Sequence, residues 1–134
     1  MIKYRAGYKY QLAEGYKLQT ELYPPVDIDN EFIHLDINGL LYIESGYAWD
    51  GPSGPTVDTK NFMEGSLVHD ALYQLIRKQD LPQSAREYAD KLLVKICKDK
   101  GMSSCRRWWV YKGVRGGAGF AASPKNVKKV FEVL

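Results

Sequence analysis

The first third of the chain alternates short hydrophobic runs with turn signals, a pattern typical of antiparallel β-strands. The runs are rich in Tyr, Ile, Leu and Thr, and they read YKYQLAE (8–14), YKLQTEL (16–22), FIHLDI (32–37) and LLYIES (40–45). Gly15, Pro24, Pro25 and the dipeptide Asn38-Gly39 separate them. An Asn-Gly pair between two strand-like runs is a strong hairpin signal. Three or four antiparallel strands are therefore predicted.

The next stretch, GYAWDGPSGPTVDTK (46–60), carries three glycines and two prolines. Such a density of turn residues predicts a loop without regular secondary structure. After it the hydrophobic period becomes helical. A first helix is predicted over 61–79 and a second over 82–101, with QDLP (79–82) as the break between them. Their apolar stripes are Val68, Leu72, Leu75 and Ile76 on the first helix, and Ala85, Ala89, Leu92, Leu93 and Ile96 on the second.

A third helix is predicted over SSCRRWWVYKGVR (103–115), losing regularity at GGAG (116–119), and a small amphipathic helix over 123–134. The fold class predicted from these elements is α+β, with N-terminal antiparallel β-strands followed by a C-terminal helical bundle built on an antiparallel helix hairpin. A length of 134 residues suits one domain, made of a β-rich part (1–45), a Gly/Pro-rich loop (46–60) and a helical part (61–134).

Composition and charge narrow the function classes. The net charge of +3 is too small to indicate nucleic acid, and no specific nucleic-acid partner is predicted. Two cysteines do not make a disulfide framework, and the chain begins MIKYRAGYKY with no apolar signal segment. No run is long enough to span a membrane. These features favour a protein kept in a reducing cytoplasm or built there into a larger assembly.

The chain has only two histidines, and one of them lies in HDALY (69–73) on the first predicted helix. His69 precedes the predicted turn near Gln79 and Asp80 by about ten residues, and Asp90 follows it by about ten. With equal rise per residue the two lie at the same height on adjacent antiparallel helices. A carboxylate on one ring nitrogen would leave the other free as a base, and Tyr73 could hold Asp90 from a second direction. A structural polar network that specifies how two helices dock is the alternative.

Asp70 is rotated by about 100° from His69 around the helix, so it can face another neighbour such as the glycine-rich loop. Carbonyl groups from WDGPSG (49–54), with one or two carboxylates, are the hard oxygen ligands that calcium prefers. Asp50 or Asp58 could add a further ligand. Later in the chain, Arg106, Arg107 and Trp108 form a basic-aromatic group that could bind phosphate or form an interface. Such a group is also common on a helix with one charged and one aromatic face.

His-Asp-x-x-Tyr on one helix, with a glycine-rich loop before it and an Asp on the next antiparallel helix, resembles the active centre of secreted phospholipases of the A-two class. The resemblance covers roughly residues 46–97. It implies His69 as general base, Asp90 as the carboxylate that orients it, Tyr73 as support for Asp90, and Asp70 as a calcium ligand. The loop ligands it implies lie within 49–54, at Trp49, Asp50, Gly51 and Gly54. The chain departs from that family in lacking secretion and disulfide marks and in placing strands before the site.

WDGPSGP together with HDALY also resembles a family of small uncharacterised proteins of tailed bacteriophages and prophages, over nearly the whole chain. This resemblance implies a location in the host cytoplasm or in the virion. The expected function is a phage-encoded hydrolase with a His–Asp dyad, calcium-assisted, acting on an ester or lipid-like substrate. The alternative is a non-enzymatic virion component or host-directed binding protein, whose partner is a phage structural protein or a host protein.

Overall fold

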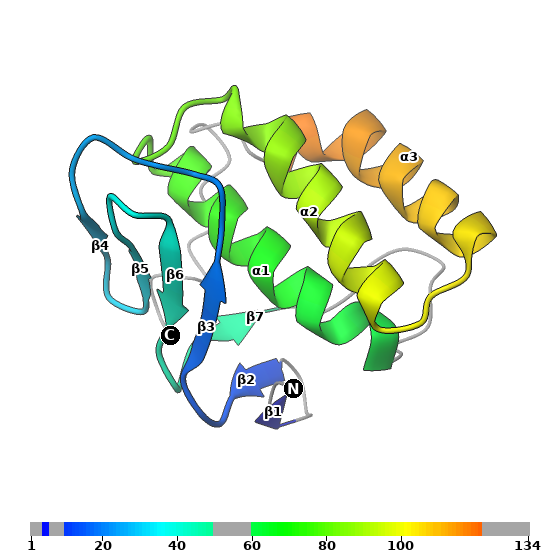
Figure 1. Ribbon diagram of the computed structural model, residues 1–134, viewed down its shortest axis with the longest axis horizontal. Helices are drawn as coiled ribbons and strands as arrows, with labels where there is room; N and C mark the ends of the chain where they lie inside the picture. The colour runs from blue at the N-terminus through cyan, green and yellow to red at the C-terminus, as the bar shows by residue number, and fades with distance from the viewer. Residues whose placement is uncertain (1–3, 6–9, 50–59, 122–134) are drawn as a thin grey trace. The chain divides into compact units, whose positions relative to one another are not determined.

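The computed structural model describes residues 4–5, 10–49 and 60–121 (Figure 1). Within them, seven strands precede three helices: β1 (Tyr4–Arg5), β2 (Tyr10–Leu12), β3 (Tyr16–Gln19), β4 (Ile28–Asp29), β5 (Ile33–Leu35), β6 (Leu40–Ile43), β7 (Ala48–Trp49), α1 (Lys60–Arg77), α2 (Ala85–Asp99) and α3 (Ser104–Ala121). Antiparallel strands followed by helices confirm the predicted α+β class. The described residues fall into two compact units, one up to residue 49 and one from residue 60. A single domain over 1–134 stays a prediction.

The strands form two antiparallel sheets, with the orders β1-β2-β7 and β3-β6-β5-β4. The predicted hairpin is confirmed, because β5 and β6 pair with Leu35 opposite Leu41 on either side of the Asn38-Gly39 dipeptide. Gly39 has a φ of +87°, which glycine adopts without steric cost. Along both strands alternate side chains are buried and make the core of this unit, namely Ile33, Leu35, Leu41 and Ile43.

The prediction of an irregular loop from residue 46 was wrong at its start. Ala48 and Trp49 form β7 and pair with Gln11 and Tyr10 of β2. Trp49 is fully buried, and its ring lies 5.8 Å from the ring of Tyr10, centroid to centroid. Burial of this large side chain outweighs the turn propensity of its neighbours. The other strands beyond the predicted number, β1 and β4, have two residues each and carry no period that a sequence pattern could reveal.

The helical unit is built on the predicted hairpin, in which α2 packs against both α1 and α3 (Figure 1). Both predicted apolar stripes are buried: Val68, Leu72, Leu75, Ile76, Ala85, Ala89, Leu92, Leu93 and Ile96. The chain turns after α1 at Gln79, which has a φ of 67°. At the end of α2, Gly101 takes a φ of +93° and the Met102 amide donates to the Cys97 carbonyl at 2.9 Å, so the helix ends just before Gly101.

The third helix is longer than its pattern predicts. α3 continues through GGAG to Ala121 instead of losing regularity at residue 116. Glycine weakens a helix by roughly 1 kcal/mol relative to alanine but does not remove a backbone hydrogen bond, so several glycines can be tolerated. The amphipathic helix predicted over 123–134 lies outside the described residues.

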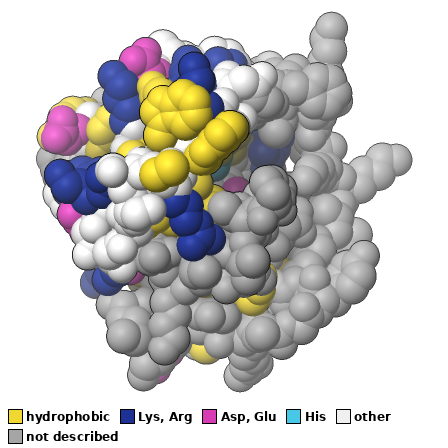
Figure 2. All heavy atoms as spheres, turned by 90° about the vertical axis from the view of Figure 1, so that its right-hand side faces the viewer, with side chains coloured by type: hydrophobic (Ala, Val, Ile, Leu, Met, Phe, Trp, Pro, Cys, Tyr) yellow, Lys and Arg dark blue, Asp and Glu magenta, His cyan; other side chains and the backbone are white. Residues whose placement is uncertain are grey.

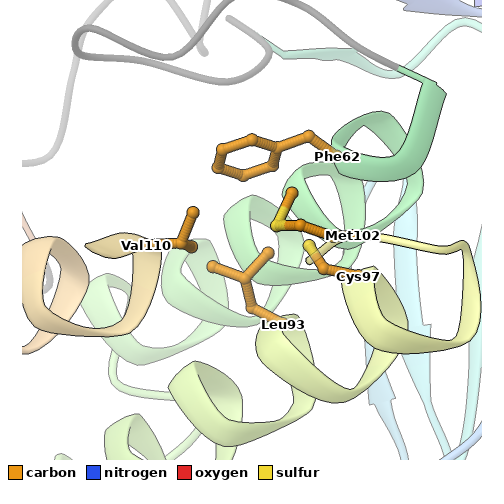
Figure 3. Packing of buried hydrophobic residues seen from close by; sticks show 5 residues of the cluster. All are labelled: Phe62, Leu93, Cys97, Met102 and Val110. Atoms are coloured by element: carbon orange, nitrogen blue, oxygen red, sulfur yellow. The ribbon is translucent and has the colours of Figure 1, made fainter. Parts of the chain in front are cut away.

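A hydrophobic cluster joins the three helices (Figure 3). Its buried members point toward one another from α1, α2, the turn after α2 and α3: Phe62, Leu93, Cys97, Met102 and Val110. Val114 packs against the cluster from α3. The cluster therefore fixes α3 against the hairpin. The hydrophobic pattern of each helix taken alone does not predict this packing.

Gly65 lets α1 and α2 approach closely. A Cβ added there would lie 2.7 Å from Leu93 Cδ1 and 3.2 Å from the Leu93 carbonyl oxygen. The space beside Gly65 is thus filled by α2. We expect Gly65→Ala to lower the free energy of unfolding by roughly 1–2 kcal/mol, because Leu93 must shift within a packed cluster. Chemical denaturation would measure the change.

Gly113 of α3 provides the matched control, because a Cβ there would meet nothing within 4 Å. Gly113→Ala should raise stability by roughly 0.5–1 kcal/mol through helix propensity alone. Equal gains at both positions would show that the helices are not in close contact at Gly65.

His34, the second histidine, lies on β5 between two carboxylates. Its Nδ1 is 2.8 Å from Asp29 Oδ1, and its Nε2 is 2.5 Å from Glu44 Oε2. Burial lowers the pKa of His34, but the hydrogen bonds to Glu44 and Asp29 outweigh it and raise the pKa above its usual value. Both ring nitrogens donate only in the protonated imidazolium, so this form suits the two carboxylates.

A pH dependence of stability follows from this arrangement. The stabilisation from His34 should be complete below about pH 6.5 and should be lost as pH rises through the raised folded-state pKa. We expect the difference in Tm between wild type and His34→Gln to be largest near about pH 5.5 and to shrink toward about pH 8.5. A difference that grows with pH would contradict this assignment.

Candidate functional site

His69 and Asp90 meet between the antiparallel helices α1 and α2. The Nε2 atom of His69 lies 2.7 Å from Oδ1 of Asp90. Asp90 is fully buried, whereas His69 keeps 8% of its surface exposed. The predicted hydrogen bond is confirmed. Because Nε2 faces the carboxylate, Nδ1 is the ring nitrogen left for other chemistry.

Tyr73 holds the same carboxylate from a second direction, as predicted. Its hydroxyl donates to Asp90 Oδ1 at 2.5 Å. The rings of His69 and Tyr73 pack with their centroids 4.1 Å apart, which follows from their positions one turn apart on α1. His69 and Tyr73 thus reach one oxygen of Asp90 together.

Arg115 of α3 completes the network and was not predicted from the sequence. Its Nη1 donates to the other oxygen of Asp90, Oδ2, at 2.8 Å, and its side chain is 31% exposed. A buried carboxylate needs such compensation, because an unpaired charge in the interior is costly. A sequence signal for this role does exist. Arg115 directly follows Val114, and Val110 and Val114 are apolar positions one turn apart on the third predicted helix.

The network shifts the pKa values of its members. Burial raises the pKa of Asp90, but hydrogen bonds from His69, Tyr73 and Arg115 outweigh burial and hold it below its usual value. Burial and the neighbouring Asp90 both raise the pKa of Tyr73. Asp90 is therefore an anion and Tyr73 a neutral donor at neutral pH.

Asp70 lies on the other side of His69. Its Oδ1 is 4.0 Å from His69 Nδ1, which is too long for a hydrogen bond, and its side chain is 31% exposed. Burial lowers the pKa of His69, but interactions with Asp70 and Asp90 outweigh burial and raise it. Asp70 thus acts on His69 Nδ1 by its charge and reaches solvent beside it.

The predicted calcium ligands are only partly placed. Trp49 is buried in β7 of the other unit, and Asp50, Gly51, Gly54 and the loop around them lie outside the described residues. Among the residues that the structure describes, no group of three or more His, Cys, Asp or Glu side chains could hold a metal ion. Of the predicted ligands that the structure describes, Asp70 has a partly exposed carboxylate.

The predicted binding residues Arg106, Arg107 and Trp108 lie together on the first half of α3. The two arginines are half-buried, and Trp108 is exposed. Trp109, which the prediction omitted, is exposed as well. They are separate from the His69 network, whose residue on α3 is Arg115 in the second half of the helix.

Residues 28–114 match a family model described as "Protein of unknown function (DUF1353)". The match covers more than half of the chain, so the chain belongs to this family. It includes His69, Tyr73 and Asp90, whereas Arg115 follows its last residue. The predicted membership of an uncharacterised family is confirmed. No curated protein and no solved structure matches the chain.

Proposed function

We propose that the chain is a hydrolase of an ester or lipid-like substrate, with His69 as general base and Asp90 as the carboxylate that orients it. The observation that carries the proposal is the 2.7 Å contact between His69 Nε2 and Asp90 Oδ1. This contact leaves Nδ1 on the side of the ring that faces away from Asp90. His69 itself keeps 8% of its surface exposed. The motifs WDGPSGP and HDALY support a phage or prophage origin, with action in the host cytoplasm or the virion.

In the proposed reaction, the Nε2–H group of His69 donates to Asp90, and the lone pair of Nδ1 accepts a proton from water. The water oxygen then attacks the carbonyl carbon of the ester. The proton on Nδ1 passes to the leaving alkoxide, which restores the neutral ring. Tyr73 and Arg115 hold Asp90 throughout, so the ring keeps one orientation and one tautomer.

The protonation state of His69 sets the conditions for an assay. A general base must be unprotonated at the start of the reaction, and the pKa of His69 is raised. Wild-type turnover should therefore be sought at neutral to alkaline pH. Short-chain esters and phospholipid vesicles, each with and without calcium, are the substrates that test the proposal. Turnover of none of them by folded protein would contradict it.

Calcium is part of the proposal, with Asp70 as the ligand on α1. Its carboxylate is a hard oxygen donor, is partly exposed and lies beside His69 Nδ1. The remaining ligands would come from the predicted loop, at Gly51 and Gly54. Bound calcium would supply positive charge to the oxygen that becomes negative in the reaction.

Calcium should raise the Tm of the wild-type chain, because a ligand bound only by the native state stabilises it. A rise of several degrees is expected at saturating calcium, and none in Asp70→Ala. Asp99→Ala is the control, since Asp99 is an exposed acid on α2 paired with Lys95. A shift that Asp70→Ala retains, or no shift in wild type, would exclude Asp70 as a calcium ligand.

A second candidate is a non-enzymatic virion component or host-directed binding protein. The observation that favours it is the participation of Arg115, because a polar network that joins α1, α2 and α3 also suits a purely structural role. The exposed aromatic residues of α3 would then form the contact surface.

A further inference from the structure

Two adjacent tryptophans project from α3 into solvent. Trp108 is 54% exposed and Trp109 is 65% exposed, while the next residue, Val110, is buried in the core cluster. Large aromatic side chains usually bury most of their surface, so two exposed neighbours indicate a surface with a binding role. Figure 2 shows hydrophobic side chains gathered on one face, with several Lys and Arg side chains and a few acidic ones around them.

The charge around the tryptophans is entirely basic on this helix. Arg106 and Arg107 precede them, and Lys112 Nζ lies 5.6 Å from the centroid of the Trp108 ring. No acidic residue occurs in Ser104–Ala121. The first half of α3 thus combines exposed indole rings with three cations, which favours an anionic binding partner.

We propose that Arg106, Arg107, Trp108, Trp109 and Lys112 form a peripheral binding surface for an anionic lipid bilayer. Indole rings prefer the boundary between water and hydrocarbon, because they combine a large apolar body with one polar N–H. Arginine and lysine beside them reach the phosphate groups of the lipids. In the described part of the chain no helix is long and apolar enough to cross a membrane, so this surface would lie on the bilayer.

The ring geometry favours a bilayer over single-stranded nucleic acid. Trp108 and Trp109 pack edge to face, with centroids 5.0 Å apart and planes at 82°, and Lys112 lies over the Trp108 ring. Successive bases stack on open, accessible ring faces. Here one ring carries an ammonium group on its face and the other meets it at an edge. A lipid interface requires only that the rings reach the headgroup region.

The test is co-sedimentation of the full chain with vesicles of phosphatidylcholine alone and of phosphatidylcholine mixed with phosphatidylglycerol. We expect binding to the mixed vesicles that weakens with salt and little binding to phosphatidylcholine alone. Trp108→Ser combined with Trp109→Ser should abolish it. Lys112→Gln should weaken it about fivefold, as expected for one cation near an anionic surface. Tyr23→Ser is the matched control, because Tyr23 is 65% exposed in the other unit.

A label at Cys105 gives a second measurement that does not depend on the tryptophan variants. Cys105 is exposed at the start of α3, whereas Cys97, the other cysteine of the chain, is buried and burial raises its pKa to about 11. An environment-sensitive thiol probe should therefore react at Cys105. Its emission should shift to the blue on mixed vesicles.

Several results would overturn the proposal. One is that the wild-type chain binds both kinds of vesicle equally. Another is that folded Lys112→Gln binds mixed vesicles as strongly as the wild type does. A third is that mixed vesicles give neither binding nor an emission shift. Retention of the folded chain by single-stranded nucleic acid or by an acidic protein, without vesicle binding, would assign the surface to that class of partner. None of these results depends on turnover, so this inference can fail while the proposed hydrolase stands.

Discussion

Replacing Asp90 by alanine is expected to lower the free energy of unfolding by roughly 3 kcal/mol and the Tm by roughly 10 °C. Asp90 is fully buried and accepts hydrogen bonds from three helical side chains, His69, Tyr73 and Arg115. Its loss leaves a buried hydroxyl and a half-buried guanidinium without their acceptor. This loss of stability lies at the lower end of the range for breaking a buried ion pair, because the partly exposed Arg115 can still turn to solvent.

Two further variants make this measurement specific. Asp90→Asn keeps the shape and one carbonyl oxygen for His69 and Tyr73, but it then places the amide nitrogen, a donor, before the guanidinium of Arg115, so an intermediate loss is expected. Asp99→Ala removes an exposed acid from the same helix and should change stability by no more than about 0.5 kcal/mol. Asp90→Ala as mild as Asp99→Ala would contradict the network.

The hairpin part of the site could be predicted because it rests on local rules. The apolar stripes of α1 and α2 gave two helices, and QDLP gave the turn between them. Equal rise per residue on both sides of that turn then placed His69 and Asp90 at one height. None of these steps needs knowledge of any other part of the fold.

The rest of the site depends on contacts between elements far apart in sequence. Arg115 reaches Asp90 only because Val110 and Val114 fix α3 against the hairpin. Trp49 became a strand residue because β2 offers it a partner, which the Gly/Pro-rich composition of 46–60 hides. The exposure of Trp109 likewise depends on which side of α3 faces the core.

His69→Gln is expected to reduce turnover at least about a hundredfold while leaving the chain folded, since general-base catalysis contributes on that order. The glutamine amide can still donate to Asp90, so most of the network survives. It cannot accept a proton from water at neutral pH. If the network is purely structural, there is no turnover to lose, and the only effect of the change is on the free energy of unfolding, by roughly 1–3 kcal/mol where the glutamine amide fails to reach Asp90.

His34→Gln is the matched control for this variant. His34 is the other histidine of the chain and lies on β5, where both ring nitrogens already face carboxylates. Its replacement should leave turnover unchanged. An equal loss of turnover in both variants would point to a general effect of histidine replacement on the fold.

The central claim is that the contact between His69 and Asp90 orients a general base. Its most direct test is the paired measurement of Tm and of ester and phospholipid turnover, for wild type and His69→Gln, with and without calcium. The account predicts wild-type turnover that the variant loses while its Tm stays close to that of wild type. Absence of turnover in wild type, together with a large fall in Tm in the variant, would contradict it and leave the network a structural one.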